Sequence, residues 1–200
     1  MKNKLKALVS VILAAAVLVA CASCGKNGES NTSTNDGADF PYTSAESLLS
    51  EVWKSYSEEE KFHAIGGDEN HMNEEGPGKY SIEDAEVLDS VLGFPSAEIS
   101  KIDDAASLMH AMNQNTFTCA AFRFKNEKDI EGGIAALKRN ILSRRWICGF
   151  PDSLVIAKAP GNYVIAVWGI DEGNGTVSLF KQKLKSAVDG VQISVDEEIV

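Results

Sequence analysis

Apolar residues first recur with helical spacing just after residue 42. Thr43 and Glu46 have the spacing of an N-terminal capping box, in which each side chain bonds the other's backbone. The apolar positions behind them share one helical face; they are Leu48, Leu49, Val52, Trp53 and Tyr56. This pattern predicts an amphipathic helix of roughly four turns.

A second helix is predicted after a polar, glycine-rich loop at residues 66–78. It begins at Ser81, which opens a similar capping box, and Gly93 is its expected C-cap, with Pro95 preventing continuation. Its apolar stripe consists of Ile82, Ala85, Leu88, Val91 and Leu92. Residues 97–113 predict a third helix, because helical spacing relates Ile99, Ile102, Ala106 and Met109.

The next segments predict a strand and a further helix. Residues 116–124, TFTCAAFRF, are rich in strand formers, and both faces are mainly apolar until Arg123, which indicates a strand covered on both sides. Asn126 precedes a helix whose stripe is Ile130, Ile134, Leu137 and Ile141. Gly132 and Gly133 weaken this helix by about 1 kcal/mol each relative to Ala. Close packing against a sheet would explain them, and so would chance.

A hairpin and a final helix complete the pattern. Residues 154–157 and 163–168 are predicted strands, and Pro160-Gly161 between them is typical of a type II turn. Helical spacing then relates Val177, Phe180, Leu184 and Val188. Residues 191–200 alternate weakly and predict either a short edge strand or a frayed tail.

This order of elements is typical of an α+β fold. We expect a small, mostly antiparallel sheet built as strand–helix–hairpin–helix, with helices on one face and the additional N-terminal helices packed on it. The chain has room for one core of ordinary size, so we expect a single globular domain at residues 41–200.

The first twenty residues have the pattern of an export signal. Three lysines precede an almost purely apolar run at residues 7–20. The run ends Leu18-Val19-Ala20-Cys21, which resembles the lipobox of bacterial lipoproteins. That resemblance implies cleavage before Cys21 and attachment of a diacylglyceryl group to its sulfur. We therefore expect a signal peptide at residues 1–20 and a lipid anchor at the extracytoplasmic face of the cell membrane.

Other interpretations of this terminus remain open. Ala20-Cys21-Ala22 also fits ordinary signal cleavage, which would free the protein after Ala22. The apolar run up to Cys24 is at the lower limit of length for one membrane span. Cys21 could stand near the signal end by chance. Cys24 could also carry the lipid, although Cys21 would then occupy a position where an aliphatic residue is favoured.

Residues 21–40 predict a flexible polar tether. Their Gly, Ser, Thr, Asn and acidic residues cannot bury enough apolar surface to offset the entropy cost of ordering. A tether of about 20 residues has an r.m.s. reach on the order of 25 Å. The 200-residue chain has a formal net charge of −10, and the part beyond residue 20 has −13. We expect no nucleic acid partner, because such binding requires a basic surface.

Three features of the folded part are also found together in a known family. They are the strand at residues 116–124, the helix at 129–147, and the hairpin with Gly161-Asn162-Tyr163-Val164 in its second strand. With the lipobox and the acidic tether, they resemble small lipoproteins of Gram-positive bacteria, a domain-of-unknown-function family, number 4358 in that series. The resemblance implies an envelope location and this fold, and it implies no activity. The longer helical lead-in and the pair Cys119 and Cys148 depart from the family pattern.

Cys119 and Cys148 are the cysteines of the folded part. A crossover helix returns the chain beside its strand, so the two residues could approach within disulfide range, and export permits the bond. Two buried free thiols are the alternative, because cysteine is common in cores. We expect no catalytic thiol, since the spacing is not CxxC and no histidine stands near either residue.

The remaining candidate sites are weaker. In the loop at residues 66–78, His71, Glu74 and Glu75 could hold a divalent metal, although their spacing fits no EF-hand or zinc pattern and a solvated acidic loop is simpler. A basic cluster could dock an anionic partner or be a polar helix face; it comprises Lys138, Arg139, Arg144 and Arg145. Three tryptophans could line a groove or belong to the core edge: Trp53, Trp146 and Trp168.

No catalytic constellation is recognisable, so we expect neither enzymatic activity nor a cofactor. We expect a membrane-tethered, non-catalytic binding or adaptor domain, whose partners are membrane lipid through the acyl anchor and a protein or polymer of the cell envelope. The alternative is a solute- or divalent-metal-binding lipoprotein that uses the acidic loop at residues 66–78. A hydrolase of unfamiliar type is a third and weaker hypothesis.

Overall fold

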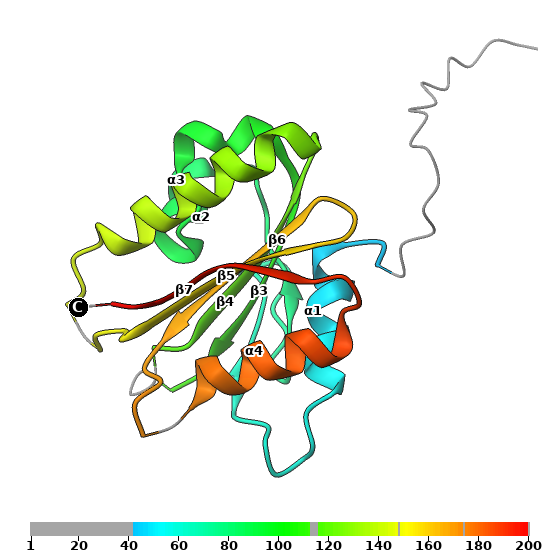
Figure 1. Cartoon of the computed structure of the whole chain (residues 1–200), viewed down its shortest axis with the longest axis vertical. Coiled ribbons are helices and arrows are strands. Elements are labelled where there is room, and N and C mark those ends of the chain that lie inside the picture. Colours follow the sequence, from blue (N-terminus) through cyan, green and yellow to red (C-terminus); the bar gives the residue numbers. More distant parts are fainter. Residues whose placement is uncertain (1–41, 113–115, 148, 174, 200) are drawn as a thin grey trace, which may run out of the picture. The chain divides into compact units, whose positions relative to one another are not determined.

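A seven-stranded antiparallel sheet forms the centre of the described part of the chain (Figure 1). The computed structural model describes residues 42–112, 116–147, 149–173 and 175–199. The strands are β1 (Ala64–Ile65), β2 (Gly78–Lys79), β3 (Ile102–His110), β4 (Thr118–Phe124), β5 (Ser153–Ala159), β6 (Tyr163–Gly169) and β7 (Gln192–Glu198). Their order is β1-β3-β4-β6-β5-β7, and β2 also pairs with β3. The predicted α+β fold is confirmed.

Helices cover both faces of this sheet. The described helices are α1 (Ala45–Lys54), α2 (Ala85–Leu92), α3 (Ile130–Leu142) and α4 (Thr176–Ala187). α1 and α4 pack on one face, whereas α2 and α3 pack on the other (Figure 1). The prediction of helices on one face only is therefore wrong. The reason is that the central strands are apolar on both sides, so each face needs its own cover.

β4 shows how one strand serves both cores. Cys119 and Ala121 belong to the core under α1 and α4, whereas Ala120 and Phe122 belong to the core under α2 and α3. This alternation confirms the two faces expected for residues 116–124. α3 then carries the chain over β6, which lies between β4 and β5 and is antiparallel to both. β4 and β5 are therefore parallel but not adjacent.

The helix predicted at residues 97–113 is wrong. Ser96–Lys101 forms a 3₁₀ turn, η1, and the rest of the segment up to His110 forms β3. β3 lies inside the sheet, between β4 and the short strands β1 and β2. Its central residues, 105–108, are all buried because both faces are covered. Burial on both faces removes the polar–apolar alternation that would have distinguished this strand from a helix.

The helix ends differ from the predictions by small shifts. α1 has ten residues, fewer than the four turns predicted, and its N-cap is Ser44 rather than Thr43. Ser44 and Ser47 form the capping box, with each side-chain oxygen 3.0 Å from the other's backbone nitrogen. α2 is capped by Asp84 rather than Ser81, since the Asp84 carboxylate accepts backbone bonds from the first turn. Gly93, at φ 71°, is the left-handed C-cap that was predicted.

The later elements follow the predictions, except that α3 ends at Leu142 and not at residue 147. The apolar stripe of α3 is buried, although Asn126 caps the short 3₁₀ turn η2 (Glu127–Asp129) and Asp129 precedes the helix itself. β5 and β6 form the predicted hairpin, with Gly161 at φ 83° as a type II turn requires. The alternatives for the end of the chain resolve in favour of an edge strand, β7. No described helix combines the length and the apolar character that crossing a membrane demands.

Candidate functional site

The segment between α3 and β5 is fastened to the domain at several points. Arg144 donates from Nη2 to the Asp89 carbonyl in α2, and its Cζ lies 6.0 Å from the ring centroid of Trp146. Trp146 packs against the core under α2 and α3. Gly149 has φ 68°, and a Cβ there would lie 2.2 Å from Cγ2 of Thr116. The backbone at Gly149 therefore passes directly against Thr116, two residues before β4.

Two large apolar side chains of this fastened segment are exposed. Ile147 is 90% exposed and Phe150 is 69% exposed, which are the highest values for large apolar side chains in the described ranges. We call these two residues the exposed apolar pair. Pro151, the next residue, is buried, and Gly149 lies so close to Thr116 that a side chain at position 149 would clash with it. The pair is thus held in solvent by its anchored neighbours, which is typical of an interaction surface.

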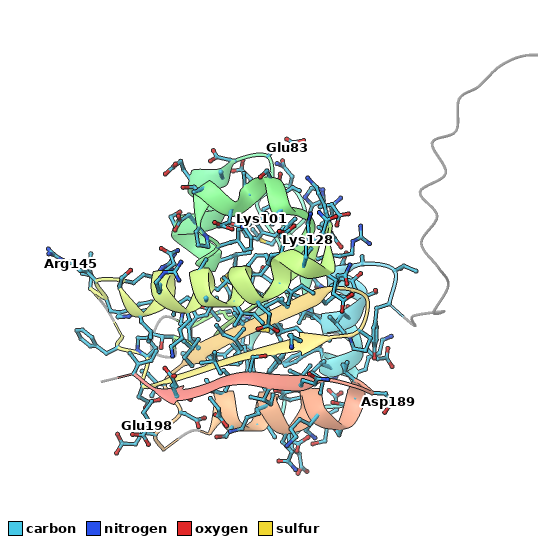
Figure 2. All side chains as sticks on the ribbon, turned by 45° about the horizontal axis from the view of Figure 1, so that its top comes forward. Glu83, Lys101, Lys128, Arg145, Asp189 and Glu198 are labelled. Atoms are coloured by element: carbon cyan, nitrogen blue, oxygen red, sulfur yellow. The ribbon has the colours of Figure 1, made fainter. Side chains whose placement is uncertain are left out.

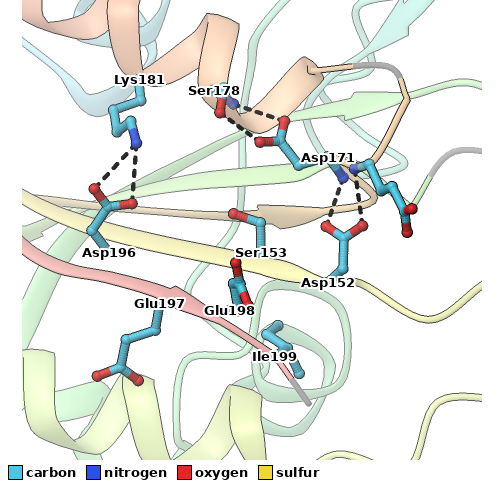
Figure 3. A pocket seen from close by; sticks show the side chains of 10 residues that line it. Asp152, Ser153, Asp171, Ser178, Lys181, Asp196, Glu197, Glu198 and Ile199 are labelled. Atoms are coloured by element: carbon cyan, nitrogen blue, oxygen red, sulfur yellow. Dashed lines mark hydrogen bonds and ion pairs between the residues drawn. The ribbon is translucent and has the colours of Figure 1, made fainter.

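An acid-lined hollow of about 730 Å³ begins two residues after Phe150 (Figure 3). We call it the acidic hollow. Its walls come from the start of β5, the loop between β6 and α4, the first turns of α4 and the end of β7. Six carboxylates line it: Asp152, Asp171, Glu172, Asp196, Glu197 and Glu198. Lys181 is its one cationic side chain, so the lining has a formal net charge of −5.

Two of these carboxylates shape the hollow. Asp152 accepts bonds from the backbone nitrogens of Asp171 and Glu172, at 2.7 and 2.9 Å, which hold the loop after β6 against β5. Asp171 accepts bonds from the nitrogen and hydroxyl of Ser178, at 2.9 and 2.5 Å, and so fixes the start of α4 (Figure 3). The rim is therefore rigidly built from segments distant in the sequence.

The other four carboxylates differ in how far they are neutralised. Both oxygens of Asp196 are 3.1 Å from Nζ of Lys181, and Glu197 pairs with Lys138 of α3. The side chains of Glu172 and Glu198 have no hydrogen bond or ion pair with any described residue. These two charges are available to an incoming cation.

The hollow lies at the end of the domain remote from the first described residue. Ser153 pairs with Glu198 at this end of the sheet, whereas Lys158 pairs with Gln192 at the other. Figure 2 shows Arg145 and Glu198 at one end and Asp189 at the opposite end. The hydroxyl of Tyr42 donates to the carbonyl of Ala187, 3.2 Å away, beside Asp189. The chain therefore enters the domain away from the hollow and the exposed apolar pair.

The predicted lipidation site lies outside the described residues. Cys21, the signal peptide at residues 1–20 and the tether at 21–40 belong to that part of the chain. Cys148 is also outside, so its disulfide with Cys119 stays a prediction. Cys119 itself is completely buried, and burial raises the pKa of its thiol well above the ordinary value.

The acidic loop at residues 66–78 is organised around Asp68. The Asp68 carboxylate accepts bonds from the backbone nitrogens of Asn70, His71 and Ser81 and is 2.8 Å from Nδ1 of His71. Burial opposes ionisation of Asp68, but these bonds outweigh it and lower its pKa. His71, Glu74 and Glu75 are exposed, and no three His, Cys, Asp or Glu side chains within the described ranges are grouped to hold a metal.

The basic cluster and the tryptophans do not form shared sites. Lys138 pairs with Glu197, and Arg144 with Asp89, whereas Arg139 and Arg145 are exposed. Trp53 and Trp168 are buried in cores on opposite faces of the sheet, and Trp146 is half-buried. A groove lined by all three rings is therefore excluded.

The sequence reasoning missed both parts of the site. The hollow joins Asp152, Asp171 and Glu198, which are far apart in the chain. The exposed apolar pair could have been noticed in the sequence. Ile147 and Phe150 are apolar residues that belong neither to the apolar stripe of α3 nor to β5. No family model matches the chain, and no curated protein or solved structure matches it either. The site is thus interpreted from its own geometry.

Proposed function

We propose that this protein is an extracytoplasmic lipoprotein whose domain is a non-catalytic binding or adaptor module of the cell envelope. The observation that carries the binding role is the exposed apolar pair beside the acidic hollow. Burying one side chain of this size contributes roughly 1.5–3 kcal/mol. A partner that covered Ile147 and Phe150 would therefore gain binding free energy from their burial. Membership of the Gram-positive lipoprotein family named above is part of the same proposal.

The anchor in this proposal is the lipobox cysteine. The basic start, the apolar run and the sequence Leu18-Val19-Ala20-Cys21 support it. Two or more acyl chains hold a protein firmly at a bilayer, whereas one is marginal. Tyr42, the first described residue, lies at the end of the domain remote from the exposed apolar pair.

Changing the anchor cysteine tests the location. We expect the Cys21→Ala protein to leave the membrane fraction of lysed cells, or to remain unprocessed, whereas a Cys24→Ala control fractionates like the parent. The mass of the mature N-terminus gives an independent reading, with Cys21 as a lipidated first residue. Identical fractionation of the Cys21→Ala protein and the parent, or an unmodified Ser23 as first residue, would contradict the proposal.

Crosslinking in intact cells tests the binding role. A photo-crosslinking residue placed at Phe150 of the full chain should give discrete adducts with an envelope component, identified by mass spectrometry. The matched control is Val87 in α2, an apolar side chain that is 45% exposed away from the hollow. Adducts at Val87 equal to those at Phe150, or no adduct at Phe150, would argue against this surface.

A further inference from the structure

We propose that the exposed apolar pair and the acidic hollow form one docking surface for a cationic, amphipathic polypeptide segment. This rests on the proposed function, because it names the chemistry of the partner at the same site. Lysine or arginine side chains of the segment enter the hollow, and its apolar side chains cover Ile147 and Phe150. The acidic hollow offers charge complementary to the segment's cations, and the exposed apolar pair offers an apolar area for its apolar side chains.

The two parts share one rim. Phe150 is followed by buried Pro151 and then by Asp152, whose carboxylate lines the hollow. The backbone nitrogen of Ile199 donates to the carbonyl of Asp152 at 2.8 Å, which holds the end of β7 against the start of β5. A segment lying across this rim therefore reaches apolar and acidic surface within a few residues.

The charge of the hollow selects a cation. The lining holds six carboxylates and one lysine. Both oxygens of Asp196 already contact that lysine, and Glu197 pairs with Lys138 of α3. Glu172 and Glu198 are the carboxylates of this lining whose side chains make neither an ion pair nor a hydrogen bond with any described residue. A cationic side chain placed between them gains attraction without breaking an existing ion pair. The apolar pair next to the carboxylates favours a segment over a bare metal ion or a free amine.

The same charge disfavours two other occupants. An anionic bilayer and a second copy of this chain would each bring negative charge against the hollow. Arg145 is exposed beside Ile147 on the α3 side, away from the hollow's carboxylates (Figure 2). Its exposed charge would attract anionic lipid, so a variant at Arg145 distinguishes a lipid surface from a cationic segment in the test.

Titration with defined probes tests the proposal. The full chain, kept in solution by a zwitterionic detergent whether or not it carries a lipid, is titrated with a labelled peptide of alternating lysine and leucine, and with a glutamate and leucine counterpart. We expect saturable binding of the cationic peptide alone, weakened by added salt. The double variant Glu172→Gln with Glu198→Gln should bind it about tenfold more weakly.

Matched variants separate the site from general charge and hydrophobicity. Glu83→Gln with Glu127→Gln makes the same change in net charge at exposed positions near α2 and α3, and should leave the affinity unchanged. Phe150→Ser should weaken binding about tenfold, whereas Val87→Ser should not. Equal binding of the two peptides, or equal effects of the site and control variants, would overturn the proposal.

The alternative occupants have their own outcomes. Binding to phosphatidylglycerol vesicles that Arg145→Glu abolishes and Glu172→Gln strengthens would identify a lipid surface and overturn the proposal. Dimers that Phe150→Ser dissociates, detected by sedimentation, would identify a second copy and also overturn it. Failure of the peptide titration leaves the fractionation of the Cys21→Ala protein untouched, whereas failure of the anchor leaves the titration valid. The two proposals therefore fail separately.

Discussion

Lys183 joins α4 to the end of α1 through several contacts. Its Nζ lies 2.6 Å from Oε2 of Glu60 and 3.1 Å from the carbonyl of Ser55, and it stands 5.5 Å from the ring centroid of Tyr56. The hydrogen bond from Lys183 is the largest cause that lowers the pKa of Glu60 to about 2. The folded domain therefore favours the ionised form of this carboxylate.

Acidification should remove this stabilisation in a defined range of pH. A carboxylate with a depressed folded pKa contributes its full stability above the unfolded value, near 4.5, and loses it as the pH falls toward 2. We expect Glu60→Gln to make the free energy of unfolding less dependent on pH between these values, as measured by urea denaturation. Glu58→Gln, at an exposed neighbouring acid, is the control. Parallel pH profiles for the Glu60→Gln variant and the parent would refute this.

The burial of Cys119 leads to a second prediction for a single residue. Its thiol is completely buried and its pKa is raised, so the reactive thiolate is scarce and inaccessible. In reduced protein we expect Cys119 to resist iodoacetamide until urea unfolds the domain, with alkylation located by peptide mass spectrometry. Rapid labelling in the native state would show that this side of the core opens readily.

Two adjacent glycines of α3 differ in how closely they approach the sheet. A Cβ added at Gly133 would lie 2.2 Å from Cζ of Phe124, whereas one added at Gly132 meets nothing within 4 Å. Gly133 thus permits the close approach of α3 to β4, and Gly132 has no such role. Helix–sheet packing, one of the two explanations considered from the sequence, applies to one glycine of the pair.

The two adjacent glycines give a matched test. Gly132→Ala should raise the free energy of unfolding by about 1 kcal/mol, because alanine is the better helix former and the space is open. Gly133→Ala should lower it by about 1–3 kcal/mol, since the methyl group forces Phe124 or α3 to move. Urea unfolding of both variants measures the difference. The same sign of change at both positions would contradict the packing described.

The molecule as a whole is a sheet with two separate cores and one end that presents the candidate site. Apolar side chains from the central strands fill both cores, so stability comes from burial on the two faces. The exposed apolar pair contributes to neither core. It is therefore expected to matter for a partner and not for folding.

Stability measurements can separate these two roles. Ile147→Ser combined with Phe150→Ser should leave the free energy of unfolding within about 0.5 kcal/mol of the parent, because both side chains are exposed. Phe122→Ala, in the core under α2 and α3, should cost about 3–5 kcal/mol in the same assay. A loss comparable to that of Phe122→Ala would mean that the pair packs within the domain.

Elements with a local pattern could be predicted from the amino-acid sequence alone. These features are specified by nearby residues in the chain: the apolar stripes of α1, α3 and α4, the glycine that ends α2, and the turn between β5 and β6. Each depends on backbone periodicity or on the conformational preference of glycine, which neighbours far along the chain do not alter. The export signal and the lipobox at Cys21 are local patterns of the same kind, and their role stays a prediction.

The other features of the fold and the site depend on contacts between distant segments. β3 is a strand because β4 pairs with it on one side and helices cover both its faces, although its spacing favours a helix. The acidic hollow exists because β7 returns beside β5 and Asp152 holds the loop before α4. Both depend on pairing between segments distant in the chain, whose free energy arises only once those segments meet.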